Sequence, residues 1–237
     1  MSGQDRKVVV VTGGSQGIGA GVVAGYRARG WAAVTNSRRA EAAHDPDLLT
    51  VAGDVSDPAT GDRIVSAALD RFGRIDTLVN NAGVFMSKPF TDYTAEDYSV
   101  MVGVNLTGFF ELTQRVIPEM LKEGGGHVVN ITTTLVDFAN SSRPSVLTSL
   151  TKGGLASATR SLAIEYASRG IRVNAVSPGV IQTREHSPEA YGVLARFHPL
   201  GRVGQVADVV NGILFLESSP FITGEILHID GGQIAGY

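Results

Sequence analysis

The chain has 237 residues, a length that suits one α/β domain with a full hydrophobic core. Its formal net charge is −3, so neither nucleic acid nor an anionic membrane is expected as its main partner, because both repel a protein of that sign. The 43% of hydrophobic residues and 18% of charged residues exclude a disordered chain. Cysteine is absent, which excludes disulfides, thiolate nucleophiles and zinc–thiolate sites.

Targeting segments are not evident in the sequence. Residues Met1 to Lys7 are polar and lack the apolar core of a secretory signal. No apolar run reaches the length of a membrane span, and we therefore expect a cytoplasmic protein. No linker, repeat or low-complexity segment interrupts residues 1–237, so we predict a single domain.

Short apolar strands alternate with amphipathic helices along almost the whole chain. The predicted strands are Val8–Thr12, Ala32–Asn36, Leu48–Val51, Thr77–Val79, His127–Ile131, Ile171–Val176 and Ile226–Ile229. The predicted helices are Ile18–Tyr26, Ile64–Phe72, Phe109–Met120, Leu155–Tyr166 and Val206–Leu214. Pro118 is expected to kink the third helix near its end or to change its direction.

This alternation predicts right-handed βαβ units. We therefore expect an α/β fold, with a doubly wound parallel sheet of about seven strands and helices on both faces. Residues 182–204 show weak periodicity. They are expected to form an excursion over the carboxyl edge of the sheet, on the substrate side.

A glycine-rich turn, Thr12-Gly13-Gly14-Ser15-Gln16-Gly17-Ile18-Gly19, joins the first strand to the first helix. Gly13 and Gly17 can adopt backbone angles closed to other residues, and Gly19 lets the helix pack close to the strand. The N-terminus of that helix offers N–H groups and a positive dipole end to phosphates. A plain tight turn is the alternative, but the strand–turn–helix context is typical of a Rossmann-type dinucleotide site. The predicted phosphate-side residues are Gly13, Ser15, Gln16, Gly17, Ile18 and Gly19.

The end of the second strand indicates which dinucleotide is preferred. NAD-binding folds place a carboxylate there to hold the ribose 2′-hydroxyl. This chain has Asn36-Ser37-Arg38-Arg39 instead, and guanidinium groups suit a 2′-phosphate. We predict a preference for NADP(H) involving Ser37, Arg38 and Arg39, with NAD(H) still usable and with solvated loop arginines as the alternative. Asp54 and Val55, after the third strand, are expected to border the adenine.

Several motifs in the right order make the chain resemble the short-chain dehydrogenase/reductase family over essentially its whole length. Besides the glycine-rich turn, these motifs are Asn80-Asn81-Ala82-Gly83, Ile171 to Gly179, Thr223-Gly224 and Asp230-Gly231-Gly232. The resemblance implies a seven-stranded sheet, homodimers or homotetramers, and hydride transfer between a nicotinamide and a carbonyl or alcohol carbon of a small-molecule substrate. It also implies that Asn81, Ala82 and Gly83 line the adenosine ribose. On the nicotinamide side it implies Pro178 and Gly179, with the Ile181 backbone on the carboxamide and Thr183 beside it.

The catalytic set of that family is an Asn, a Ser, and a Tyr four residues before a Lys. By resemblance, Asn105 matches the Asn and Lys152 matches the Lys, which holds the nicotinamide ribose. The Ser position falls at Thr133, which keeps a hydroxyl donor. The Tyr position falls at Thr148, whose aliphatic hydroxyl is shorter and far less acidic than a phenol with its reference pKa of about 10. Losing a positioned acid costs about 10²–10⁴ in rate.

Other residues are therefore considered as proton donors. Asp137 lies in the loop after the fifth strand, which is about two residues longer than the resemblance implies, and His186 lies in the 182–204 excursion. For both residues, the simpler interpretation is a solvated side chain on the surface. Tyr93, Tyr98 and Tyr191 lie in segments that the spacing does not place, whereas Tyr26 and Tyr166 are expected to pack helices. His127 is expected to be structural, and neither His44 nor His228 has metal-ligand spacing, so no metal is predicted.

Three hypotheses of function remain open. The first is an NADP(H)-dependent oxidoreductase with an atypical proton donor, acting on a small carbonyl, an imine or an activated alkene. The second is a catalytically impaired protein that binds or senses NADP(H). The third is a partner subunit whose helices around Phe109–Met120 and Leu155–Tyr166 pack against an intact paralogue.

Overall fold

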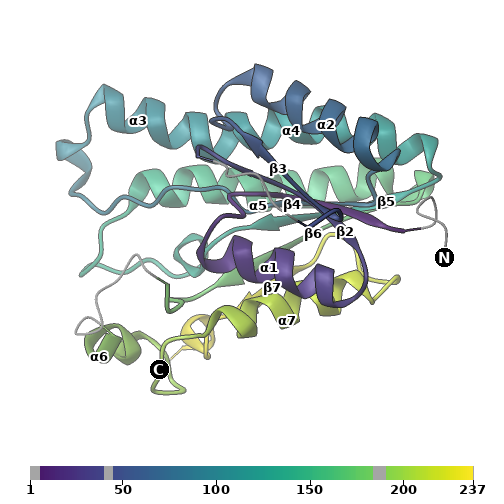
Figure 1. The fold of residues 1–237 in the computed structure, drawn as a ribbon. Coiled ribbons are helices and arrows are strands. Elements are labelled where there is room, and N and C mark those ends of the chain that lie inside the picture. The colour runs from purple at the N-terminus through teal and green to yellow at the C-terminus, as the bar shows by residue number, and fades with distance from the viewer. Residues whose placement is uncertain (1–5, 40–44, 184–190, 237) are drawn as a thin grey trace.

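Seven parallel strands form one sheet in the order β3-β2-β1-β4-β5-β6-β7 in the computed structural model, which describes residues 6–39, 45–183 and 191–236 (Figure 1). The strands are β1 (Val8–Thr12), β2 (Ala32–Ser37), β3 (Leu48–Ala52), β4 (Thr77–Asn80), β5 (Gly126–Ile131), β6 (Ile171–Pro178) and β7 (Ile226–Ile229). Every neighbouring pair is parallel. The predicted doubly wound sheet is therefore confirmed.

Helices cover both faces of the sheet (Figure 1). One face carries α1 (Gly17–Ala28) and α7 (Val206–Glu217); the other carries α2 (Pro58–Phe72), α4 (Gly108–Lys122) and α5 (Val146–Tyr166). Strand β1 shows how the core is divided, because Val8 and Val10 join one apolar cluster while Val9 and Val11 join the other. A strand buried on both faces needs a continuous apolar run, which is why the sequence lacks alternation there.

The helix boundaries correct several predictions. Helix α2 begins at Pro58, where Asp57 caps it by accepting from the Ala59 N–H, and α5 begins at Val146, well before Leu155. The chain continues in helix past Pro118 to Lys122, so this proline lies inside α4 and does not end it. The structure adds α3 (Ala95–Val102), which was not predicted although Thr94 and Asp97 form a capping box at its start.

The chain order reverses between β1 and β4, which is where parallel sheets of this kind bind ligands beyond the carboxyl ends of their strands. The segment after β6 begins with a bridge between Ile181 and Gly204, and it contains the short helix α6 (Tyr191–Leu194). Of this predicted excursion, residues 184–190, including His186, lie outside the described residues. Among the helices that the structure describes, none is long and apolar enough to cross a membrane.

Candidate cofactor and active site

The turn after β1 has the backbone geometry that its glycines predicted. Gly13 and Gly17 have φ values of 67° and 53°, in the left-handed region that side chains rarely adopt. A Cβ on Gly19 would collide with the Gly13 carbonyl oxygen, so helix α1 can approach the turn only with glycine there. The chain between Gly13 and Ile18, with Ser15 and Gln16 exposed, thus turns tightly in front of the helix N-terminus. A glycine-rich turn at a helix N-terminus is a geometry that fits a pyrophosphate.

Thr12 joins this turn to the end of β4. Its buried hydroxyl accepts from the backbone N–H groups of Asn81 and Ala82 at 3.1 and 3.0 Å, and the Asn81 side chain donates to the carbonyls of Thr12 and Gly13 at 2.9 and 3.2 Å. The carboxyl ends of β1 and β4 are therefore fixed to each other at the reversal point of the sheet. Thr12 was not among the residues predicted for the site, although its place at the end of a buried strand could have drawn attention to it.

The end of β2 presents positive charge and no carboxylate. Asn36 is buried and donates to the Val51 and Gly53 carbonyls, both at 3.0 Å, so its side chain ties β2 to β3. Arg38 and Arg39 are exposed, and within the described ranges their guanidinium groups form no hydrogen bond or ion pair. The Ser37 hydroxyl donates to the Arg39 carbonyl at 3.0 Å.

Asp54 lies close to this arginine pair, at the end of β3. Its carboxylate accepts from the Ser56 N–H and hydroxyl at 2.9 and 2.7 Å. These two bonds, with a smaller effect of Arg38, lower the pKa of Asp54. Val55 follows it and packs against Gly108 at the start of α4. Asp54 is therefore a fixed anion whose charge is already compensated within its own turn.

Asn105 lies in a π-helical turn, Gly103–Thr107, between α3 and α4. Its side chain accepts from the Val84 N–H at 2.8 Å and donates to the Val84 carbonyl at 3.0 Å and to the Thr151 hydroxyl at 3.1 Å. This one buried amide therefore connects the loop after β4 to helix α5. Single π-helical turns are frequent at functional sites.

Lys152 is the only buried lysine among the described residues. Its ammonium donates to the Ile131 carbonyl at the end of β5 at 2.7 Å, and a Cβ on Gly83 would lie 3.0 Å from the Lys152 Nζ and 3.3 Å from the Asn105 Oδ1. Burial lowers the pKa of Lys152 to about 8. Asn105, Lys152 and Gly83 thus lie close together at the ends of β4 and β5.

Thr133 lies at the start of the loop that follows β5, and Thr148 lies just beyond the end of that loop. The Thr133 hydroxyl accepts from the Leu135 N–H at 3.4 Å, and the residue has an extended backbone that starts a short 3₁₀ turn. Thr148 is buried in the first turn of α5, on the same helix face as Lys152. Its hydroxyl contacts the backbone of Met86, 3.5 Å from the N–H and 3.4 Å from the carbonyl oxygen.

The turn after β6 is held by His198. The His198 Nε2 accepts from the Val180 N–H at 3.0 Å and Nδ1 lies 3.2 Å from the Leu194 carbonyl, so the ring is a neutral imidazole with both nitrogens used. Burial lowers its pKa, in agreement with that form. A Cβ on Gly179 would collide with this ring. Pro178 therefore ends β6, and Gly179, Ile181 and Thr183 follow it in the turn that His198 holds. This role of His198 was not predicted from the sequence.

The other candidate donors are dispersed. Asp137 lies 3.1 Å from the His228 Nε2 near β7, and Tyr98 is exposed on α3. The Tyr191 hydroxyl donates to the Thr183 carbonyl at 2.7 Å, whereas the Tyr93 hydroxyl donates to the Met86 carbonyl at 2.9 Å. His186 and His44 lie outside the described residues. Across the part of the chain that the structure describes, no group of three His, Cys, Asp or Glu side chains is arranged for a metal ion.

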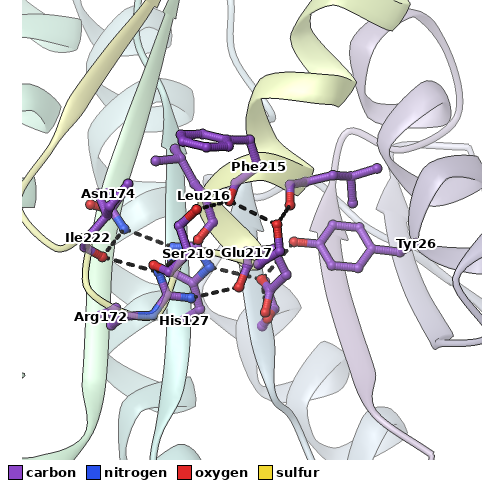
Figure 2. Close-up of polar contacts among 12 residues, drawn as sticks. Tyr26, His127, Arg172, Asn174, Phe215, Leu216, Glu217, Ser219 and Ile222 are labelled. Carbon is purple, nitrogen blue, oxygen red and sulfur yellow. Dashed lines mark hydrogen bonds and ion pairs between the residues drawn. The ribbon is translucent and has the colours of Figure 1, made fainter.

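A second cluster of titratable groups lies at the opposite, amino edge of the sheet (Figure 2). A single carboxylate oxygen of Glu217, at the end of α7, accepts from the Tyr26 hydroxyl, the Thr77 hydroxyl and the His127 Nδ1, each at 2.9 Å. Burial opposes ionisation of Glu217, but these donors outweigh it and lower its pKa. The residue is therefore an anion enclosed by donors from α1, β4 and β5.

The cluster also fixes the protonation state of His127. Asn174 accepts from the Glu225 N–H, so its amide nitrogen is the group that donates to the Ile222 carbonyl and to the His127 Nε2, at 3.0 and 3.1 Å. His127 is thus neutral, and burial lowers its pKa accordingly. Beside it, Arg172 donates to the carbonyls of Leu216 and Glu217 at the end of α7 and to those of Ser219 and Ile222 in the segment that follows (Figure 2). These contacts make His127 a structural residue, as the sequence suggested.

Comparison with known proteins shows the family to which the chain belongs. The family model described as enoyl-(acyl carrier protein) reductase matches residues 13–233. The 3-oxoacyl-[acyl-carrier-protein] reductase of Synechocystis sp. is 33% identical over 247 residues, which cover 99% of this chain and 99% of that protein. The chain therefore belongs to the short-chain dehydrogenase/reductase family, a family of oxidoreductases, as its motifs predicted.

Solved structures agree with this assignment. The structure of ElxO with NADP bound has a TM-score of 0.91 to this chain at 30% identity and covers 98% of this chain and 100% of its own. The 3-ketoacyl-(acyl-carrier-protein) reductase from Brucella melitensis, complexed with NADH, has a TM-score of 0.87 at 30% identity with the same coverage. The similarity thus extends over the whole sheet and both helical layers.

Proposed function

We propose that this protein is an NADP(H)-dependent oxidoreductase that transfers hydride to or from a small carbonyl, imine or activated alkene. The observation that carries this proposal is the convergence of Lys152, Asn105 and Gly83 at the ends of β4 and β5. A carbonyl is the first substrate class to test, because the relatives include 3-oxoacyl-[acyl-carrier-protein] reductases.

The cofactor contacts that we propose follow the edge of the sheet. The pyrophosphate lies at Gly13 to Gly19, the adenine beside Asp54 and Val55, and the adenosine ribose along Asn81 to Gly83. Lys152 holds the nicotinamide ribose, for which its ammonium has protons beyond the one given to Ile131. The nicotinamide carboxamide lies against the backbone between Pro178 and Ile181, with Thr183 beside it.

The preference for NADP(H) over NAD(H) rests on Arg38 and Arg39. Two exposed guanidinium groups near a strand end without a carboxylate suit a 2′-phosphate. Replacing both by alanine should weaken NADPH binding by about 10- to 100-fold, a loss of charge-assisted hydrogen bonds, and leave NADH binding nearly unchanged. Fluorescence titration with the two cofactors measures both affinities. An equal loss for NADPH and NADH would contradict the assignment.

The proton donor is the atypical part of the proposed site. We take Thr148 as the residue at the usual tyrosine position and Thr133 as the substitute for the serine, donating to the substrate oxygen. The test is NADPH oxidation over a panel of carbonyls, imines and activated alkenes, for the natural protein and for Thr148→Tyr side by side. Turnover by the natural protein supports an active enzyme with another donor. Turnover by Thr148→Tyr alone supports the alternative, a cofactor-binding sensor or partner subunit.

We also propose that the protein assembles as a homodimer or homotetramer through α4 and α5, with no role for nucleic acid or a membrane. Large apolar side chains on these helices are exposed in the single chain, with Phe110 and Leu150 both 55% accessible. Light scattering on the purified protein measures its mass. A monomer at micromolar concentration would contradict this assembly, whereas a stable complex only with a paralogue would favour the partner-subunit alternative.

A further inference from the structure

Tyr93 occupies a defined position between β4 and α3. It follows a 3₁₀ turn, Phe90–Asp92, and precedes Thr94, whose side chain caps α3 by accepting from the Asp97 N–H at 3.1 Å. The Asp97 carboxylate in turn accepts from the Thr94 N–H at 2.9 Å. Hydrogen bonds on both sides therefore fix the backbone from which the Tyr93 side chain extends.

The Tyr93 hydroxyl and the Thr148 hydroxyl share one partner. The phenolic oxygen lies 2.9 Å from the Met86 carbonyl oxygen, and the Thr148 oxygen lies 3.4 Å from the same atom. Met86 belongs to the loop that begins at Gly83, where the Lys152 ammonium lies. A phenol supplied by a different element thus reaches the neighbourhood of the short side chain that stands at the usual tyrosine position.

The remaining candidates within the described residues are less suitable. Asp137 is paired with His228, and both nitrogens of His198 are occupied by backbone groups. Tyr98 is 52% exposed on α3, and the Tyr191 hydroxyl donates to Thr183 on the other side of the turn after β6.

We propose that Tyr93 is the proton donor of this enzyme, an inference that rests on the proposed function and names its missing acid. Reduced nicotinamide, when bound, supplies the hydride that adds to the carbonyl carbon. The π electrons of the C=O bond move to its oxygen, which takes the Tyr93 proton as the phenolic O–H bond breaks. The phenolate regains a proton from water, to which the half-buried side chain has access. Rotation about the C–O bond can turn the O–H away from the Met86 carbonyl, which frees the proton for donation.

The kinetic test combines two substitutions. Tyr93→Phe should lower kcat for NADPH oxidation by about 10²–10⁴-fold, the usual contribution of a positioned acid, with the NADPH affinity unchanged. In the Thr148→Tyr background the same substitution should have little effect, because the new phenol supplies the proton. Tyr98→Phe is the matched control on α3 and should retain the natural kcat.

A binding measurement provides a readout that is independent of turnover. With NADP⁺ in place of NADPH, a β-keto thioester binds without being reduced, and calorimetry gives its affinity. Tyr93→Phe should weaken this binding by about 2- to 10-fold, the contribution of one hydrogen bond, and Tyr98→Phe should leave it unchanged.

The outcomes separate this inference from the proposed function. If the natural protein turns over and Tyr93→Phe turns over equally, the donor assignment is wrong and the oxidoreductase stands. If Tyr93→Phe loses the same factor with Thr148 and with the introduced tyrosine, Tyr93 is structural and the donor assignment is again wrong. If the natural protein binds NADPH but reduces no member of the panel, both proposals are wrong.

Discussion

The two edges of the sheet differ in how completely hydrogen bonds satisfy a buried charge. At the amino edge, Glu217 is surrounded by donors from Tyr26, Thr77 and His127, and each of these partners is tied to the fold. At the carboxyl edge, Lys152 is as deeply buried but donates to a single carbonyl within the described residues, and burial lowers its pKa to about 8. A buried charge stabilises a particular packing when hydrogen bonds within the fold satisfy it completely. A buried charge that the fold satisfies only in part can still bind another molecule.

The difference has an energetic basis. Removing one member of a satisfied buried cluster leaves the others unpaired and costs their desolvation. Removing a charge that burial already penalises relieves the fold of a cost. Glu217 and Lys152 should therefore respond to truncation with opposite signs, and this contrast can be tested directly.

The largest expected effect is that of Glu217→Ala. It leaves the Tyr26, Thr77 and His127 donors buried without their acceptor, and should lower the free energy of unfolding by about 3–5 kcal/mol. Urea denaturation followed by circular dichroism measures this loss. Glu165→Ala, on the exposed surface of α5, is the control and should change stability by less than about 0.5 kcal/mol. A small effect of Glu217→Ala would show that the cluster does not stabilise the fold.

Lys152→Met should raise the stability of the fold, whereas Glu217→Ala should lower it. At pH 7 the buried ammonium is charged, so its replacement by an apolar chain of similar length should raise the free energy of unfolding by about 1–3 kcal/mol. The same variant should bind NADPH more weakly. Lys122→Met, at an exposed lysine on α4, should do neither. A destabilised Lys152→Met protein would mean that the bond to Ile131 outweighs burial, and would remove the contrast between the edges.

The pH dependence of Lys152 has a defined sign. Between pH 8 and the ordinary lysine range near 10.5, the unfolded chain binds a proton that the folded chain has lost, so stability should rise with pH in this window. The rise should be absent from Lys152→Met. Denaturation midpoints at pH 7.5, 9 and 10 measure it for both proteins.

The smallest expected effect is the response to mild acid. His127 is neutral in the fold with its pKa lowered, so the unfolded chain takes up a proton first as pH falls through about 6.5, and stability should decrease below that value. Glu217, whose pKa is also lowered, adds to the loss at lower pH. Denaturation midpoints between pH 7.5 and 5 measure the slope, which should be shallower in His127→Gln. His198 contributes with the same sign in both proteins.

Much of the fold could be predicted from the sequence because its strands are buried on both faces. The run Val8–Thr12 was predicted with its observed bounds, because a continuous and fully buried apolar run is easily recognised. The final strand, Ile226–Ile229, was also predicted with its observed bounds, although it contains His228 and only Ile226 is buried. Helix α5 begins earlier than predicted because its first turns are rich in Thr, Ser and Gly and show no apolar period. The π-helical turn around Asn105 has no pattern in the sequence from which it could have been inferred.

The candidate site was accessible from the sequence only where local motifs define it. Gly13, Gly17 and Gly19 could be assigned because their backbone roles depend on adjacent residues. Roles for Tyr93 and Glu217 could not be assigned, because the residues on which those roles depend are distant in the sequence. The carbonyl shared by Tyr93 and Thr148 comes from Met86, and the donors around Glu217 come from three separate elements.

His198 and the bridge between Ile181 and Gly204 have a consequence for how this scaffold can change. The bridge joins the two ends of the segment after β6, and His198 ties its second half to the turn that precedes it. Sequence between such anchors can be exchanged for that of a relative while the strand and the turn keep their places. If the segment lies on the substrate side, as we propose, transplanting this short stretch of chain from a relative should change the substrate preference without any redesign of the sheet that supports it.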